Sequence, residues 1–190
     1  GDNPVTVVVL SSESGVPEFM ALLEALALLV AEERSLMAFV SEAAFRSERR
    51  SWKTVVRLDL ASRICITPDV ESRRDLVLSA DMAILPDHSG RHRSIALDAM
   101  AAGIPLVASP DPAVGWLNPS TCKLIAQASV QGWADAIREL IRSEREAEML
   151  GLSARDHIRA YHLSSTHLHS LIAHYRALVE TQSPIAFEQA

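Results

Sequence analysis

Short apolar runs alternate along this chain with longer stretches that carry an apolar face at helical spacing, and this alternation constrains the fold most strongly. Strands that follow one another through helices pair in parallel, and a parallel sheet covered on both faces needs runs that are apolar throughout. The pattern therefore predicts an α/β fold, a doubly wound, Rossmann-like parallel sheet of about six strands. The predicted strands are 5–10, 36–40, 64–67, 82–85, 106–108 and 123–126.

Helical patterns fill the intervals between these strands. Gly103 is expected to end the fourth helix in the left-handed conformation. From Ser129 onward three helical patterns follow without a strand-like run, which predicts a C-terminal helical layer. We expect a single domain over 5–182, a tail at 183–190, and a tag remnant or linker at 1–4. The first four predicted helices are 17–33, 42–63 (mostly helix), 70–80 and 94–102.

Composition excludes several classes of protein. The 190 residues are 48% hydrophobic with a net charge of −6, which disfavours nucleic-acid binding through many phosphate contacts. Cys65 and Cys122 supply neither a disulfide framework nor a zinc-ligand spacing, and we expect both thiols to be buried and reduced. No apolar run is long enough for a membrane span and no signal-peptide pattern is present, so we expect a cytoplasmic protein.

One block of sequence carries a specific resemblance. A strand followed by Pro86, a glycine-containing loop, a helix with acidic Asp98 followed by Ala-Met-Ala, and a Gly-x-Pro entry into the next strand occur in that order over 81–109. This block is similar to the signature of retaining GT-B glycosyltransferases, and the chain resembles their C-terminal, donor-binding half. The flanking helices at 70–80, 133–141 and 150–161 resemble those of the family, so the likeness covers most of the chain.

The resemblance implies a site for a nucleotide diphosphate sugar at the carboxyl ends of the strands. Asp98 would bind the ribose hydroxyls in place of the usual Glu, with a reach about 1.5 Å shorter. The free amides at the start of its helix would bind the diphosphate. The donor is a substrate, so no cofactor is expected, and no histidine spacing predicts a metal site. The predicted donor-binding residues are Ser12, Glu13, Gly15, Gly90, Arg91, His92, Arg93, Ser94 and Asp98.

The chain departs from the family pattern on both sides of the donor. Gly90 stands where the family has a Glu that contacts the sugar, and the 11–17 segment lacks the family's Arg and Lys, which stabilise the departing diphosphate. Arg91 and Arg93 are candidate replacements, since a guanidinium suits phosphate oxygens, although for either residue taken alone the sequence favours a solvent-facing arginine. The first loop fits either a donor contact or an ordinary turn with a helix cap.

These observations lead to three hypotheses. The first is a glycosyltransferase donor domain, belonging to or derived from a longer chain that supplies an acceptor-binding domain, and inactive on its own. The second is a degenerate, non-catalytic pseudoenzyme used for protein interaction or scaffolding. The third is an epimerase-like member of the same fold. Catalytic residues, donor base, sugar and acceptor are not readable from the sequence.

Overall fold

The computed structural model describes residues 4–11, 17–32, 35–46, 49–68, 73–86 and 92–181. Strands and helices alternate as predicted, and three helices follow the last strand. The elements are β1 (Thr6–Val9), α1 (Pro17–Glu32), β2 (Met37–Ser41), α2 (Ala43–Arg46), α3 (Arg49–Arg57), β3 (Ile64–Thr67), α4 (Arg73–Leu78), β4 (Met82–Leu85), α5 (Arg93–Ala102), β5 (Leu106–Ala108), β6 (Lys123–Leu124), α6 (Val130–Arg142), α7 (Glu144–Tyr161) and α8 (Ser164–Thr181).

All six strands form one parallel sheet in the order β3-β2-β1-β4-β5-β6. Val7 of β1 lies opposite Ala38 of β2 on one side and Met82 of β4 on the other. The chain builds outward from β1 to β3 and then returns to continue from β4 on the other side. The predicted doubly wound α/β fold is thus confirmed, with its topological switch point between β1 and β4.

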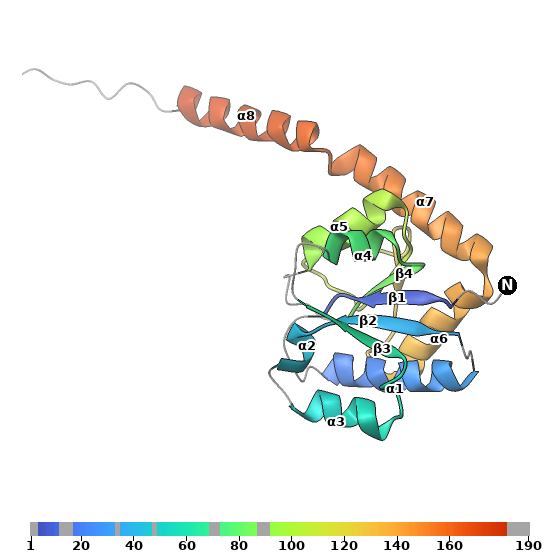
Figure 1. The fold of residues 1–190 in the computed structure, drawn as a ribbon. Coiled ribbons are helices and arrows are strands. Elements are labelled where there is room, and N and C mark those ends of the chain that lie inside the picture. The colour runs from blue at the N-terminus through green and yellow to red at the C-terminus, as the bar shows by residue number, and fades with distance from the viewer. Residues whose placement is uncertain are drawn as a thin grey trace, which may run out of the picture.

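Two helical layers cover the sheet (Figure 1). Because side chains alternate along a strand, Val7 and Val9 face a core built with α1, α3 and α6, whereas Val8 faces a second core built with α4, α5 and α7. Trp133 of α6 is completely buried in the first core. Its indole therefore packs inside the domain, as the apolar stripe of this helix predicts.

Gly103 ends α5 as predicted. Its φ of 81° is left-handed, and its N–H donates to the carbonyl of Met100 while the N–H of Ile104 donates to the carbonyl of Ala99, both at 2.9 Å. This Schellman arrangement satisfies two carbonyls that the helix leaves open. It turns the chain toward β5, so the C-terminal end of α5 is positioned by a strand of the sheet.

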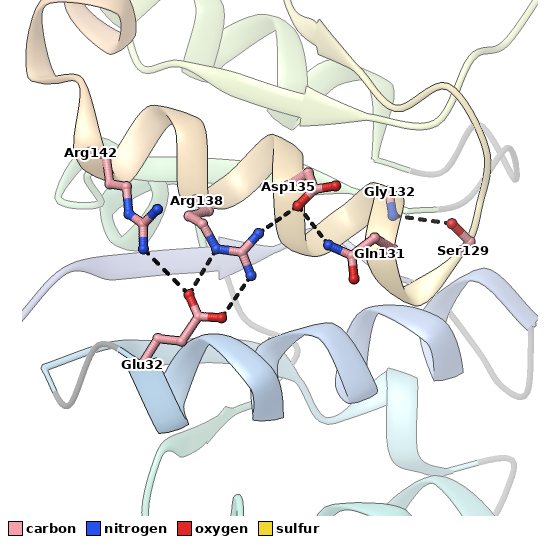
Figure 2. A network of polar contacts seen from close by, with 7 residues as sticks. All are labelled: Glu32, Ser129, Gln131, Gly132, Asp135, Arg138 and Arg142. Atoms are coloured by element: carbon pink, nitrogen blue, oxygen red, sulfur yellow. Dashed lines mark hydrogen bonds and ion pairs between the residues drawn. The ribbon is translucent and has the colours of Figure 1, made fainter.

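Polar contacts join α1 to α6 at the edge of the first core (Figure 2). Arg138 donates from Nε and Nη2 to the two carboxylate oxygens of Glu32, each at 2.8 Å, and also pairs with Asp135. Arg142 lies 3.7 Å from the same carboxylate. The hydrogen bond from Arg138 lowers the pKa of Glu32 below its ordinary value. At the other end of α6, the Ser129 hydroxyl accepts the N–H of Gly132 at 3.1 Å.

The structure corrects two expectations from the sequence. The 42–63 stretch is mostly helical as expected, but α3 ends at Arg57 rather than near Arg63, and Asp59 adopts a left-handed φ of 55°. Asp59 thereby takes the place that glycine usually occupies at a helix C-terminus. Cys65 is exposed rather than buried, because it lies on the outermost strand β3, whereas Cys122 is buried as expected.

The last helix, α8, extends away from the body of the domain (Figure 1). The predicted C-terminal helical layer is made by α6 and α7, which pack on α1 and α5 respectively. The apolar stripe of α8 is exposed and consists of Leu168, Leu171, Ile172, Tyr175, Leu178 and Val179. Within the described residues, no helix is long and apolar enough to cross a membrane.

Candidate functional site

The candidate site lies where α5 leaves the carboxyl edge of the sheet. In this topology the connection from β4 to α5 starts beside the switch point, where open α/β sheets bind ligands. Ser41 and Thr67 end the neighbouring strands β2 and β3, and they line a narrow recess together with His92. His92 is 4% exposed, so its ring fills the base of this edge rather than facing solvent.

The first turn of α5 presents backbone amides at this edge. His92 is the N-cap residue, and its side chain makes no capping hydrogen bond. The amides of Arg93 and Ser94 belong to the first turn, where a helix offers no carbonyl partner of its own. Among the described residues nothing accepts a hydrogen bond from either amide. The helix dipole adds partial positive charge here, so this terminus suits an anion.

Asp98 lies farther along the same helix and is paired with an arginine that the sequence did not single out. Oδ1 of Asp98 accepts a hydrogen bond from Nη2 of Arg74 on α4 at 2.9 Å. The Asp98 side chain is 32% exposed and that of Arg74 is 65% exposed. The carboxylate therefore faces the border between α4 and α5 and remains reachable from solvent.

Arg93 is likewise paired with a carboxylate. Its Nη2 donates to Oδ2 of Asp111 at 2.9 Å, and Oδ1 of Asp111 accepts the N–H of Ala113. Asp111 follows β5 and is 11% exposed on its side chain. The pairing draws the guanidinium of Arg93 toward the loop after β5. The Pro-Asp-Pro sequence at 110–112 could have indicated a turn that presents Asp111. No sequence pattern points to Arg74 as a residue of the site.

The structure brings four of the nine predicted donor-binding residues together on one helix. His92, Arg93 and Ser94 form the start of α5, and Asp98 lies on its second turn. The remaining five predicted residues, Ser12, Glu13, Gly15, Gly90 and Arg91, lie outside the described residues. In the part of the chain that the structure does describe, no group of three His, Cys, Asp or Glu side chains is arranged to hold a metal ion.

Comparison with known proteins decides the family. Residues 5–143, which run from the first strand through α6, match the sequence model of the glycosyl transferases group 1 family. The chain belongs to this family. Within the group 1 chain, the matched region contains the whole sheet and the helix α5 with Asp98, while α7 and α8 follow it.

A curated relative is the D-inositol 3-phosphate glycosyltransferase of Mycobacteroides abscessus. The group 1 chain is 29% identical to it over 136 residues, an alignment that covers 68% of this chain and 30% of the relative. A second such enzyme, from Mycolicibacterium smegmatis, is 31% identical over 64% of this chain and 29% of its own length. The group 1 chain thus spans less than a third of the length of these relatives.

Solved glycosyltransferase structures share the fold at low sequence identity. A glycosyltransferase from Rickettsia africae superposes with a TM-score of 0.80 at 16% identity, over 95% of this chain and 49% of that one. Anabaena HepE in complex with UDP-glucose superposes with a TM-score of 0.74 at 20% identity, over 92% and 49% of the two chains. These likenesses establish that the group 1 chain has the architecture of one half of a GT-B enzyme.

Proposed function

We propose that this chain is the donor-binding half of a group 1 glycosyltransferase and holds a nucleotide diphosphate sugar for glycosyl transfer. One observation carries the proposal: the first turn of α5, whose leading amides meet no acceptor among the described residues, and the carboxylate of Asp98 lie on one helix beside the switch point. Asp98 lies five positions after Arg93, which corresponds to about 7.5 Å along the helix. An anion at the helix start and hydroxyls at Asp98 therefore fit a ligand that carries both groups.

The comparisons support the same ligand class. HepE was solved with UDP-glucose, and the curated relatives are named as glycosyltransferases. Because the chain spans about half of the solved neighbours, the acceptor would be bound by a further domain, in the same chain or in another. We propose that closure of that domain excludes water from the reacting sugar, which this half does not do alone.

Binding without turnover is expected of the isolated 190 residues. Loss of the diphosphate leaving group creates negative charge, and one missing donor at such a site costs about 3 kcal/mol of transition-state stabilisation. Both arginines described at the site, Arg74 and Arg93, are neutralised by Asp98 and Asp111. The donor is therefore bound mainly through amides and hydroxyl contacts, and we expect no metal requirement.

Isothermal titration calorimetry tests this proposal. UDP, UDP-glucose and GDP are titrated into the chain in the presence of EDTA, and we expect at least one to bind. Asp98→Ala should lower the affinity for the bound nucleotide by about tenfold, because a hydrogen bond to a charged group is lost. Asp156→Ala, which changes an exposed aspartate on α7, is the matched control and should leave affinity unchanged. Absence of heat with all three ligands would refute the proposal.

A second candidate function is a non-catalytic interaction module, and α8 favours it. Six apolar side chains on this helix are exposed, and large exposed apolar patches commonly mark protein contacts. Sedimentation velocity separates the two functions. A chain that associates, becomes monomeric with Leu171→Ser and Tyr175→Ser, and binds none of the three nucleotides would support the interaction module instead.

A further inference from the structure

The ion pair between Arg74 and Asp98 joins two helices at the candidate site. Asp98 belongs to α5, and Arg74 comes from α4, which packs against α5. The contact is a single hydrogen bond of 2.9 Å from Nη2 of Arg74 to Oδ1 of Asp98. Exposed ion pairs of this kind contribute little to folding stability, because solvent screens them and both side chains lose rotamer freedom.

The pairing leaves most of the hydrogen-bonding capacity of Asp98 in place. An ionised carboxylate offers about four acceptor positions on its two oxygens. Arg74 uses one position on Oδ1, and no described residue donates to Oδ2. The carboxylate can therefore accept ligand hydroxyls through Oδ2 while Arg74 remains bound to Oδ1.

The contact also restricts where the carboxylate points. Asp98 is partly exposed, so without a partner its carboxylate would rotate among several orientations in solvent. A ligand that needs one orientation would then have to fix it on binding, which lowers affinity. A guanidinium anchored on a neighbouring helix fixes that orientation before the ligand arrives.

We infer that Arg74 is a positioning residue for recognition of the donor ribose: it orients Asp98 so that Oδ2 accepts the ribose hydroxyls. The inference rests on the proposed function and adds to it a residue that acts through Asp98. Two other effects of Arg74 are physically distinct. Its charge would attract the phosphates of any nucleotide, whereas competition for Asp98 would oppose binding of the hydroxyls.

Two probes separate orientation from charge. UDP carries both ribose hydroxyls, and 2′,3′-dideoxy-UDP carries the same phosphates without them. The quantity to measure by calorimetry is the ratio of their dissociation constants in the wild-type chain, in Arg74→Met and in Arg57→Met. Arg57 is the matched control, because it lies on α3 and forms a similarly exposed ion pair with Glu24 at 3.3 Å. Helix α3 covers the other face of the sheet, away from the candidate site.

The wild-type chain and Arg57→Met should prefer UDP over the dideoxy probe by about tenfold. Arg74→Met should lose most of that preference through weaker UDP binding, with unchanged affinity for the dideoxy probe. A purely structural role would not change this ratio, and thermal melts monitored by circular dichroism check that each variant is folded. If Arg74→Met is unfolded, Arg74→Gln replaces it, since glutamine keeps a polar side chain of moderate length.

Each other outcome overturns a defined statement. Equal weakening of both probes by Arg74→Met assigns Arg74 to phosphate attraction and overturns the inference, as does tighter UDP binding or an unchanged ratio. These results leave the proposed function standing, because UDP still binds to the wild-type chain. If the wild-type chain binds GDP but not UDP, the same ratio is measured with GDP and 2′,3′-dideoxy-GDP. If it binds none of UDP, UDP-glucose and GDP, the proposed function fails, and the inference fails with it.

Discussion

Gly151 of α7 packs against Gly103 at the end of α5 so closely that a β-carbon added to Gly151 would overlap the carbonyl oxygen of Gly103. The backbones of the two helices are therefore in direct contact at this point. Since α5 begins at the candidate site and ends at Gly103, this contact fixes the far end of the helix that carries Asp98.

Replacing Gly151 by alanine should destabilise the domain. Alanine is favoured over glycine inside a helix by about 1 kcal/mol, so propensity alone predicts the opposite result. Overlap with the backbone of Gly103 forces α7 away from α5, and we expect a net loss of about 1–3 kcal/mol in the free energy of unfolding. Urea unfolding followed by circular dichroism measures this quantity.

The matched control for this change is Gly115→Ala. A β-carbon on Gly115 would have no atom within 4 Å, so this substitution should change the free energy of unfolding of the chain by less than about 0.5 kcal/mol. If the two substitutions change the free energy of unfolding equally, the close approach of α5 and α7 does not require glycine at position 151.

The fold was predictable because its determinants are local. Each strand is a short apolar run, and the stop signal of Gly103 lies within its own helix, so six strands and the end of α5 follow from neighbouring residues. The end of α3 was missed because an aspartate, Asp59, occupies a position where sequence rules look for glycine. Exposure of Cys65 was missed because strand order, which places β3 at the edge, is not written in any one segment.

The candidate site was only partly predictable for a related reason. Asp98 and the start of α5 lie within one contiguous block, and that block identified them. Arg74 and Asp111 lie 24 and 18 residues from their partners, on other elements. No spacing rule connects such positions, because the contacts exist only after α4 and the loop after β5 have been placed around α5.

The link between Glu32 and Arg138 should make stability depend on pH in the acid range. The hydrogen bond from Arg138 lowers the pKa of Glu32 below 4.5, so the folded state holds this carboxylate charged where the unfolded state begins to bind a proton. The stabilisation is complete above pH 4.5 and is lost as pH falls through the lowered pKa. Urea unfolding of wild type and Glu32→Gln should show a difference at neutral pH that shrinks as the pH falls below 4.5.

Arg138→Met provides the control for the Glu32 prediction. Without this guanidinium, the largest cause of the lowered pKa is removed and only the more distant Arg142 remains, so Glu32→Gln introduced into this variant should have a smaller, less pH-dependent effect. A wild-type difference that is the same in acid and at neutral pH would contradict the prediction.

The two cysteines should react with thiol reagents at very different rates. Burial raises the pKa of Cys122 to about 11, so its reactive thiolate is scarce as well as inaccessible near neutral pH. Cys65 is exposed on β3. A short pulse of iodoacetamide followed by peptide mass spectrometry should therefore label Cys65 in the folded chain, and both residues in guanidinium chloride. Labelling of Cys122 first would contradict the described packing.

His157 should reduce stability as the solution becomes mildly acidic. Burial is the larger cause that lowers the pKa of His157. The charge of His162, whose ring centre lies 5.6 Å away, lowers this pKa further. The unfolded chain then takes up a proton near pH 6.5 that the folded chain resists, so stability falls as pH falls below this value. Relative to wild type, His157→Gln should gain stability between about pH 7.5 and 5.5 in thermal melts.

His162→Gln tests the cause of the His157 effect. Removing the repelling charge should reduce the pH dependence without abolishing it, because burial is the larger cause. A pH dependence that vanishes in His162→Gln would show that repulsion, rather than burial, dominates.

Because all six strands run in one direction, every loop that leaves their carboxyl ends meets at a single rim, while the Gly103–Gly151 contact and the Glu32–Arg138 link lie elsewhere. Mutations at that rim can change what is recognised without weakening what keeps the chain folded. Ligand recognition and folding stability thus depend on separate sets of residues, and the first can be lost while the second persists.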